Sequence, residues 1–538
     1  MRRGTRLTRT LSRLEDRINR PLVFGLAVVA VLGLTALFGI LFGYISVDSW
    51  YYMLLAQTFR QGHGFTLHGE YLAVYPAGYP IVLGLTAPNT DFSTLVVSSK
   101  IANLVLLSSS FLMLWKASKN PLMAAVCVLN PVVLLIGLYT WSENLLFFCF
   151  SGALYAIARL NVRNDWKNHL LLGVFLVLGC LARYVFAPFA FILWLCTWIA
   201  FDRRTAIRAL PAFVVTGLLF IAYHEFNRET TGFGTGMPRV PAPETFYLIC
   251  ADFVQAFAGI AVWIVAALAI LIALGWRQIR LSPPDRKDST SLFLLLAGAG
   301  FLALAFVLRA RTLFDPFGTR TIGYGISLLA AGLAGRYIHL KRSRALPVAA
   351  ILASGVFSAV YADGTAIPDS FVRLLHHDYL LPAQGVKSMR SKAPPADMMV
   401  FFQLPAPDGR MGIMDTVEEI NYGPRTPVLA PHAGPDLQPQ SARDFIQQVI
   451  PYAHKRCYFD FAGFDDASDV QDYVNARTLV DQSFSLIPGK TQNRYVYNFT
   501  PSVRTYITAI ARPGKIVPCA DILALPQTQA ALKASPGR

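Results

Sequence analysis

Charged residues are scarce in this chain of 538 residues, because Asp, Glu, Lys and Arg together make up only 15% of it. A typical soluble domain carries about 25% charged residues. Hydrophobic residues reach 54%, and the mean hydropathy is strongly positive at +0.44. The shortage of charge argues against a soluble protein, and the excess of apolar residues predicts a polytopic membrane protein.

Acidic residues are scarcer than basic ones, which gives a formal net charge of +16. A positive charge of this size can indicate nucleic-acid binding, but its distribution argues against that function. Residues 363–538 contain 17 Lys and Arg against 17 Asp and Glu, whereas residues 1–362 contain 31 against 15. The whole excess therefore lies in the hydrophobic part of the chain, where it predicts membrane orientation.

Cysteine is also rare, with seven residues, and no C-x-x-C or H-E-x-x-H spacing occurs. The sequence therefore indicates no particular cofactor, and it leaves a requirement for a divalent metal open. Five of the cysteines lie in or beside apolar segments, as expected of small packing residues. Cys457 and Cys519 lie in the polar tail, and the sequence is equally compatible with a disulfide between them and with two free thiols.

Long hydrophobic runs dominate the first 362 residues. Eleven of them approach the roughly 20 residues that a membrane-spanning helix needs. They lie near residues 22–44, 93–116, 121–138, 142–158, 168–182, 185–201, 206–224, 250–275, 291–308, 321–338 and 346–362. We therefore predict a basic N-terminal segment at 1–21 and an all-α membrane domain of about 11 transmembrane helices at 22–362.

Basic residues predict the orientation of these helices. If the spans alternate from a cytoplasmic N-terminus, 23 of the 31 basic residues fall on the cytoplasmic side, as the positive-inside rule requires. The first span has no convincing cleavage site, so we expect it to be retained. Residues 363–538 then lie outside. Strand-like runs such as "KRCYFDFAGF" and helix-like runs such as "SARDFIQQVIPYAH" predict a small extracytoplasmic α/β domain there.

Acidic residues follow the first and third spans. Asp48 comes directly after the first span, at the start of a large outer loop (45–92), and Glu143 stands at the outer start of the fourth span. A carboxyl group in a membrane-facing cleft is a candidate general base. Both positions also suit helix caps. Glu70 is a possible second acid, although Glu70 and His63 also fit ordinary solvated loop residues.

The other eight basic residues are expected on or near the outer side, against the topological bias. Five of them are candidate phosphate ligands: Lys100, Arg183, Arg309, Arg311 and Arg320. A cation at the bilayer centre costs roughly 2.5 kcal/mol or more. Snorkelling to the outer headgroups would explain any one of them. Taken together they predict a site for a lipid-linked phosphate, because guanidinium groups bind phosphate oxygens bidentately.

The opening loop resembles a known family. The run "DSWYY" at 48–52 and the turn "YPAGYP" at 75–80 are similar to the GT-C fold glycosyltransferases, and most similar to the bacterial protein O-mannosyltransferase and lipid A aminoarabinose transferase branch. Supporting matches are "SSKIANLVL" around Lys100, "WSENLLF" from 141, "LARY" at 181–184 and "FDPFGTR" at 314–320. The sequence departs from that pattern at three positions: Ser49, Ala77 and Thr321.

The resemblance implies a glycosyltransferase in the bacterial inner membrane, with its C-terminal domain in the periplasm. A polyprenyl-phosphate sugar would be the donor, and a lipid, glycan or protein the acceptor. Asp48 would be the general base, and the five basic residues would bind the donor phosphate. The sugar pocket would be shaped by aromatic side chains and one histidine: Trp50, Tyr51, Tyr52, Tyr75 and His63. An interfacial aromatic belt is the alternative for the aromatic residues. A helix at 79–87 is too short to span and would roof the site.

Two other functions fit parts of this pattern. A transporter or flippase for an amphipathic lipid-linked substrate would also carry intramembrane charges. The absence of an internal repeat and the gathering of charges on one side disfavour it. A non-catalytic scaffold that keeps the fold is the third possibility, and it would tolerate the loss of the Asp48 carboxylate.

Overall fold

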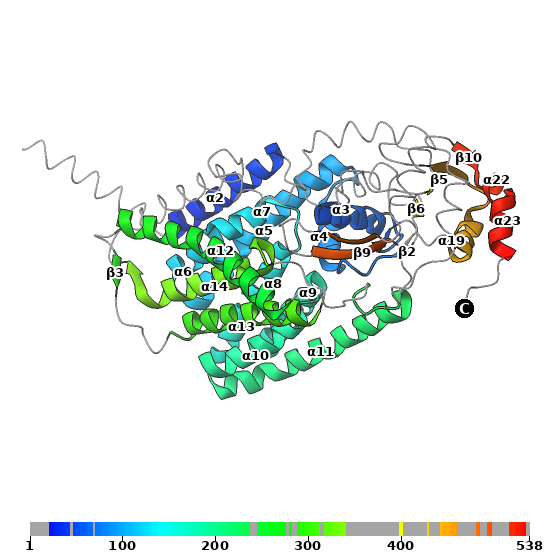
Figure 1. The fold of residues 1–538 in the computed structure, drawn as a ribbon. Coiled ribbons are helices and arrows are strands. Elements are labelled where there is room, and N and C mark those ends of the chain that lie inside the picture. Colours follow the sequence, from blue (N-terminus) through cyan, green and yellow to red (C-terminus); the bar gives the residue numbers. More distant parts are fainter. Residues whose placement is uncertain are drawn as a thin grey trace, which may run out of the picture. The chain divides into compact units, whose positions relative to one another are not determined.

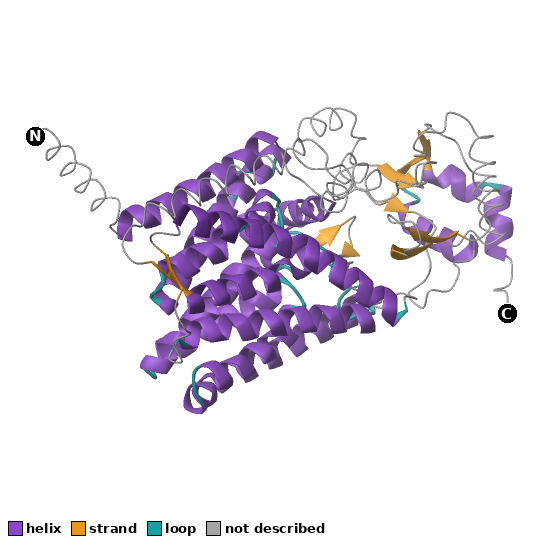
Figure 2. Ribbon diagram, turned by 60° about the vertical axis from the view of Figure 1, so that its left-hand side comes forward, coloured by secondary structure: helices purple, strands orange, loops and turns teal. Residues whose placement is uncertain are grey.

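The protein is represented by a computed structural model. It describes residues 21–42, 47–67, 70–236, 245–275, 279–281, 288–312, 317–340, 398–401, 428–429, 442–459, 480–484, 492–497 and 516–533. The chain divides into two compact units. The first comprises Met1–Met53, Tyr75–Phe226 and Thr245–Pro382, and the second comprises Leu54–Val74, Asn227–Glu244 and Ala383–Arg538. Figures 1 and 2 show helices in the first unit and both strands and helices in the second.

The first unit is built from helices. They are α2 (Pro21–Phe42), the start of α3 (Val47–Arg60), α4 (Gly78–Thr86), α5 (Phe92–Ser118), α6 (Pro121–Leu129), α7 (Pro131–Leu138), α8 (Glu143–Val162), α9 (Trp166–Ala182), α10 (Phe186–Ala200), most of α11 (Arg203–Thr231), α12 (Phe246–Gly275), α13 (Ser289–Arg311) and α14 (Thr319–Tyr337). A short ladder pairs β3 (Ile279–Leu281) with β4 (Ile338–Leu340). Ten of the eleven predicted spans coincide with these helices, and the eleventh, at 346–362, lies outside the described residues.

Within the described ranges, five helices are long and apolar enough to cross a membrane. They lie in α5, α8, α11, α12 and α13. The bent pair α6 and α7 would make a sixth span, and α2, α9 and α10 contain shorter apolar stretches. The short helix expected at 79–87 is confirmed as α4. These findings support an integral membrane protein, while the full number of spans stays a prediction.

The segment predicted as one span at 121–138 is broken in the middle, with a bend of 52°. Asn130 lies at the break. Its side chain accepts a hydrogen bond from the backbone N–H of Val133 at 3.1 Å, and it donates to the carbonyl of Cys127 at 2.8 Å. Pro131 follows, where its missing N–H costs nothing at the first position of a new helix. After the break, α7 leads into the connection at 139–142, which contains Trp141 and precedes Glu143 at the start of α8.

Close backbone approaches hold the helices that carry the site. A Cβ atom on Gly298 of α13 would lie 2.7 Å from the carbonyl oxygen of Gly325 in α14, so a larger side chain would separate this pair. Figure 1 shows α13 and α14 side by side. A Cβ atom on Gly78 of α4 would likewise lie 2.7 Å from the backbone of Leu181. Small residues at such crossings are typical of membrane helix packing.

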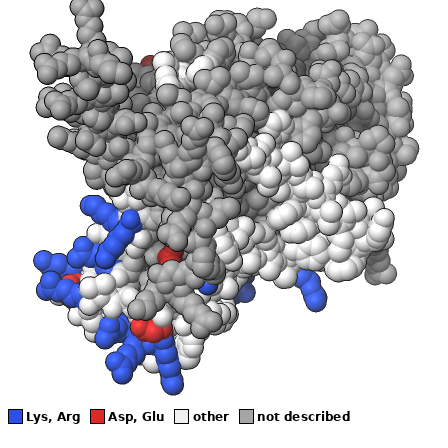
Figure 3. All heavy atoms as spheres, turned by 90° about the vertical axis from the view of Figure 1, so that its left-hand side faces the viewer, with Lys and Arg blue, Asp and Glu red and all other residues white. Residues whose placement is uncertain are grey.

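One end of the helical unit is basic. Arg208 at the start of α11 donates to the Leu160 carbonyl near the end of α8, at 3.3 Å. Thr290 at the start of α13 donates to the Ala117 carbonyl at the end of α5, also at 3.3 Å. These bonds bring the helix ends together. The exposed cations of this basic end are Lys116, Lys119, Arg163, Lys167, Arg203 and Arg204. Figure 3 shows such a gathering of Lys and Arg on the described surface.

The second unit contains the strands of the tail. A four-stranded sheet has the order β10–β7–β5–β6, with β5 parallel to both β6 and β7 and β10 antiparallel to β7. The bounds are β5 (Met398–Phe401), β6 (Val428–Leu429), β7 (Arg456–Phe459) and β10 (Ile516–Pro518). Helices α19 (Ala442–Val449), α22 (Cys519–Ala524) and α23 (Pro526–Lys533) accompany it, together with a 3-10 turn, η1 (Ile450–Tyr452).

Two hairpins complete this unit. One pairs β1 (Thr66–Leu67) with β2 (Glu70–Tyr71), and the other pairs β8 (Val480–Phe484) with β9 (Gln492–Tyr497). Strands β5, β7 and β9 and helix α19 lie in runs that the sequence predicts as strands and a helix, whereas β6, β8, β10, α22 and α23 were not predicted. A second helix, predicted in the run "DDASDVQDYVNART" at 465–478, falls outside the described residues. The expected domain boundary near 363 falls outside them as well.

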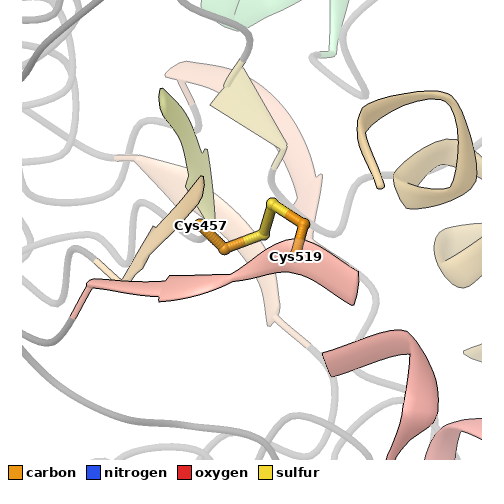
Figure 4. Close-up of a disulfide and its surroundings, with 2 residues drawn as sticks. All are labelled: Cys457 and Cys519. Atoms are coloured by element: carbon orange, nitrogen blue, oxygen red, sulfur yellow. A yellow bond between two sulfur atoms is a disulfide. The ribbon is translucent and has the colours of Figure 1, made fainter. Parts of the chain in front are cut away.

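The tail contains a disulfide bond. Cys457 in β7 and Cys519 at the start of α22 are joined, with their Cα atoms 5.0 Å apart, and both side chains are buried (Figure 4). Of the two possibilities that the sequence left open, the structure forms the disulfide. The pairing of β10 with β7 explains it, because the antiparallel register places Val517 opposite Cys457 and so brings Cys519 close.

Candidate active site

Asp48 lies in the first turn of α3, directly after the first apolar helix. Its side chain is 23% exposed, and each carboxylate oxygen accepts a hydrogen bond. The Tyr75 hydroxyl donates to Oδ1 at 2.9 Å, and Arg320 donates through Nη1 to Oδ2. Burial by itself raises the pKa of Asp48, but the Arg320 guanidinium and the Tyr75 bond outweigh it, so the pKa lies below its ordinary value. Asp48 is therefore an anion at neutral pH.

Glu143 is the first residue of α8 and is only 1% exposed. One of its oxygens, Oε1, accepts hydrogen bonds from both Arg183 and Arg320. The Tyr324 hydroxyl donates to its backbone carbonyl at 2.5 Å. A buried carboxylate is costly unless it is paired and hydrogen-bonded. The two guanidinium groups meet that requirement.

Arg320 joins the two acids, since it donates through Nη1 to Asp48 and through Nε to Glu143. Its guanidinium carbon also lies 5.1 Å from the centroid of the Trp141 ring, a cation–π distance. Asp48, Glu143, Arg183 and Arg320 thus form one connected charge cluster, with two positive and two negative groups. All four members were predicted as site residues.

The connections between helices place this cluster. Arg183 follows α9 in an extended conformation, and Glu143 opens α8 after the connection from α7. Arg320 is the second residue of α14, and Asp48 the second of α3. Each residue therefore stands where a helix begins or ends. The four helix ends meet at the charge cluster. For α8 and α9, these are the ends opposite to the ones near Arg163 and Lys167, which belong to the basic end.

Tyrosine side chains surround the Asp48 side of the charge cluster. Tyr51 stacks on Tyr75 with ring centroids 5.0 Å apart, and Tyr52 meets the edges of Tyr75 and Tyr79 at 5.3 Å each. The Tyr52 hydroxyl lies 2.7 Å from the Ser142 Oγ. Burial raises the pKa of Tyr52 to about 12, so its hydroxyl stays protonated at neutral pH. Trp50, in contrast, is 1% exposed and belongs to the hydrophobic core.

Lys100 is fully buried in α5, beside the connection that leads to Glu143. Its ammonium group donates to the Thr140 Oγ1 at 3.1 Å, and that hydroxyl lies 2.7 Å from the Ser99 Oγ. Thr140 follows the C-terminal end of α7, where unpaired carbonyls favour a positive charge. Gly39 leaves room for the lysine stem, because a Cβ there would lie 3.1 Å from the Lys100 Cδ.

The other predicted residues stand on α13 and in the second unit. Arg309 is buried and Arg311 exposed, both in the last turn of α13. His63 is exposed in the turn after α3, and Glu70 lies in β2; both belong to the second unit. Within the described ranges, no three His, Cys, Asp or Glu side chains come together in a way that could hold a metal ion.

Residues that contact the predicted ones but were not singled out from the sequence include Tyr79, Thr140, Trp141, Ser142 and Tyr324. Trp141 and Ser142 precede Glu143 directly, so adjacency in the "WSE" run is a usable signal. Tyr324 lies four residues after Arg320 on α14, a spacing that places both on one helix face. Tyr79 belongs to the "YPAGYP" turn that was recognised as a motif.

No protein-family model matches the sequence, and no curated protein matches it. Solved structures do resemble the fold. The structure of ArnT from Cupriavidus metallidurans bound to undecaprenyl phosphate is 12% identical, with a TM-score of 0.51 over 88% of this chain and 97% of that one. The Archaeoglobus fulgidus oligosaccharyltransferase in complex with zinc and sulfate is 11% identical, with a TM-score of 0.39 over 80% of this chain and 68% of that one.

ArnT, a lipid A aminoarabinose transferase, has the GT-C fold. Its similarity extends over nearly the whole of both chains, so the protein described here has the GT-C fold. The fold predicted from the "DSWYY" and "YPAGYP" runs is thereby confirmed, although the sequence identity is low.

Proposed function

We propose that the protein is a membrane glycosyltransferase that moves a sugar from a polyprenyl-phosphate donor to a hydroxyl or amine acceptor on a lipid, glycan or protein. The observation that supports this most directly is the charge cluster. It joins a candidate base, Asp48, to the candidate phosphate ligands Arg183 and Arg320. The GT-C fold agrees with this function, and the ArnT structure contains undecaprenyl phosphate.

In the proposed reaction, the acceptor oxygen or nitrogen attacks the anomeric carbon of the donor sugar. Its proton passes to the Asp48 carboxylate as the new bond forms. The bond between the anomeric carbon and the phosphate oxygen breaks, and its electron pair stays on the phosphate, so polyprenyl phosphate leaves. The lowered pKa of Asp48 ensures that the carboxylate is free of a proton when the acceptor arrives.

The leaving phosphate gains one negative charge in this step. Arg183 and Arg320 would stabilise that charge, which is present only as the bond breaks. Glu143 is assigned a positioning role, because it is buried and binds both guanidinium groups. Lys100, Arg309 and Arg311 would add positive potential around the phosphate. Tyr51, Tyr52 and Tyr75 would form the wall that excludes water from the sugar.

Orientation is part of the proposal. The basic end would face the cytoplasm of a bacterium and the charge cluster would face the periplasm, since exposed Lys and Arg accumulate on cytoplasmic loops. A lipid-linked donor diffusing in the outer leaflet of the inner membrane would then reach Asp48 directly. The disulfide in the tail agrees with this orientation, because disulfides form in oxidising compartments.

The experiment is a transfer assay with purified protein in lipid nanodiscs and a panel of radiolabelled polyprenyl-phosphate sugars. We expect Asp48→Asn to lower the rate of transfer by about 10²-fold or more, because positioned general bases contribute about 10²–10⁴-fold. Asp91→Asn is the matched control, since Asp91 is exposed before α5. Transfer by the Asp48→Asn variant at the normal rate would remove Asp48 from its role.

A further inference from the structure

The ion pair between Asp48 and Arg320 is the accessible edge of the charge cluster. The side chains of Asp48, Arg320 and Arg183 are 23%, 21% and 18% exposed, whereas Glu143 is 1% exposed. An anion that approaches the cluster therefore meets the Asp48–Arg320 pair, while the bonds to Glu143 lie behind it. A partly exposed ion pair is also weaker than a fully buried one.

Arg320 can exchange one partner without losing the other. It uses Nη1 for Asp48 and Nε for Glu143, and a guanidinium has five N–H donors. If the bond to Asp48 breaks, Glu143 and the Trp141 ring still hold the guanidinium in place. Tyr75 likewise keeps Asp48 in position through its bond to Oδ1. The exchange therefore needs no rearrangement of helices.

We propose that the phosphate of the donor lipid displaces Asp48 from Arg320, so that binding of the donor itself releases the catalytic base. This inference rests on the proposed function and extends it. Asp48 and the phosphate compete for one guanidinium group. In the protein without donor, Asp48 is held as an ion pair and is a weak base; in the donor complex it has lost that partner and accepts a proton more readily.

The charges of the proposed reaction agree with this exchange. With a phosphodiester donor bound, the cluster and the donor carry three negative and two positive groups. When the acceptor proton reaches Asp48, that carboxyl becomes neutral while the leaving phosphate gains a second negative charge. The net charge of the site is unchanged, and the negative charge has moved from Asp48 to the phosphate. Arg320 is thus needed at the phosphate when Asp48 no longer needs it.

The test is a direct binding measurement with undecaprenyl phosphate, which carries no sugar, on protein in nanodiscs. Asp48→Asn removes the competing anion, so we expect it to tighten binding by about fivefold. This factor corresponds to the upper end of the interaction energies of exposed ion pairs. Tyr75→Phe is the matched control: it removes the other hydrogen bond of Asp48 but keeps the carboxylate, and it should not tighten binding. Asp48→Ser repeats the test if the Asp48→Asn variant does not fold.

A double-mutant cycle separates exchange from simple repulsion between Asp48 and the phosphate. In an Arg320→Ala background, the exchange predicts that Asp48→Asn no longer tightens binding, whereas through-space repulsion would keep the gain. Equal or weaker binding by both the Asp48→Asn and Asp48→Ser variants, or a gain that persists in the Arg320→Ala background, would overturn the exchange. Wild-type protein that neither binds undecaprenyl phosphate nor transfers sugar would instead overturn the proposed function.

Discussion

The two ends of the helical unit carry charge in opposite ways. Among the described residues of the basic end, six Lys and Arg side chains stand exposed, and Arg163 forms an ion pair with Asp165 at 3.2 Å. At the other end, two arginines are held between two carboxylates, and Glu143 is almost fully buried. In the proposed orientation, the first kind of charge would contribute to topology through the number of cations on one side of the membrane. The second kind of charge depends on exact placement, because each charged group of the cluster is held by ion pairs with its partners.

Loss of Glu143 should have the largest effect on stability. Glu143→Gln would leave Arg183 and Arg320 without their shared carboxylate, and removing one partner of a buried pair costs about 3–5 kcal/mol. The two arginines are 18–21% exposed, so we expect a lower value of about 2–3 kcal/mol. Thermal unfolding in detergent measures it. Glu229→Gln, at an exposed position of α11, should leave unfolding unchanged; equal shifts in both variants would contradict the comparison.

Arg320→Lys should mainly affect catalysis. Lysine keeps the charge but lacks the planar fork that reaches Asp48 and Glu143 together. We expect the rate of transfer to fall by about 10²-fold, similar to the loss of one oxyanion-stabilising donor. Arg204→Lys at the exposed basic end provides the control. Normal turnover by the Arg320→Lys variant would show that charge alone is sufficient at this end as well.

The pH dependence of transfer should reveal the environment of Asp48. Because the pKa of Asp48 is lowered in the protein without donor, kcat/KM for the donor should stay constant down to a pH below the ordinary range of an aspartate and then fall. Tyr75→Phe removes a hydrogen bond that lowers this pKa, so the acidic fall should move to higher pH. Tyr247→Phe, on an exposed tyrosine, should not move it.

The same carboxyl should affect stability. A group with a depressed pKa stabilises the folded protein above its unfolded pKa, and this contribution is lost as the pH falls through the folded pKa.

An acidic fall of kcat/KM that Tyr75→Phe does not move would mean that another group limits the rate of transfer.

The smallest effect is expected at the basic end. Arg203→Gln and Arg204→Gln should each change the free energy of unfolding by less than about 0.5 kcal/mol, as surface substitutions usually do. Sugar transfer should stay normal. Unfolding in detergent measures the free energy, and the transfer assay measures the rate of sugar transfer. A strong loss of transfer from either variant would show that the basic end takes part in the chemistry.

Hydropathy predicted ten of the helices, because a lipid-facing helix must be apolar along its length whatever its neighbours are. The break at Asn130 escaped this reasoning, since a long window averages over the "NP" pair that ends one helix and begins another. The four members of the charge cluster were found because charge at the outer ends of spans is rare. Which acid pairs with which arginine was not predictable, because that depends on how helices distant in sequence meet.

Lys100 shows the same limit. The cost of a buried cation indicated a partner, and a phosphate was the expected one. In the structure its ammonium group donates to Thr140 beside the C-terminal end of α7. The sequence does not reveal that a helix end will be the partner of Lys100, because the position where α7 ends is set by the folding of the connection at 139–142.

The bond between Cys457 and Cys519 has a practical consequence for handling the protein. The two residues are 62 positions apart, so the chain between them forms a covalent loop. A protease that cuts once within this loop leaves both fragments attached to each other. The nicked chain would keep its full mass on a gel without reductant and would separate into two pieces once a thiol is added.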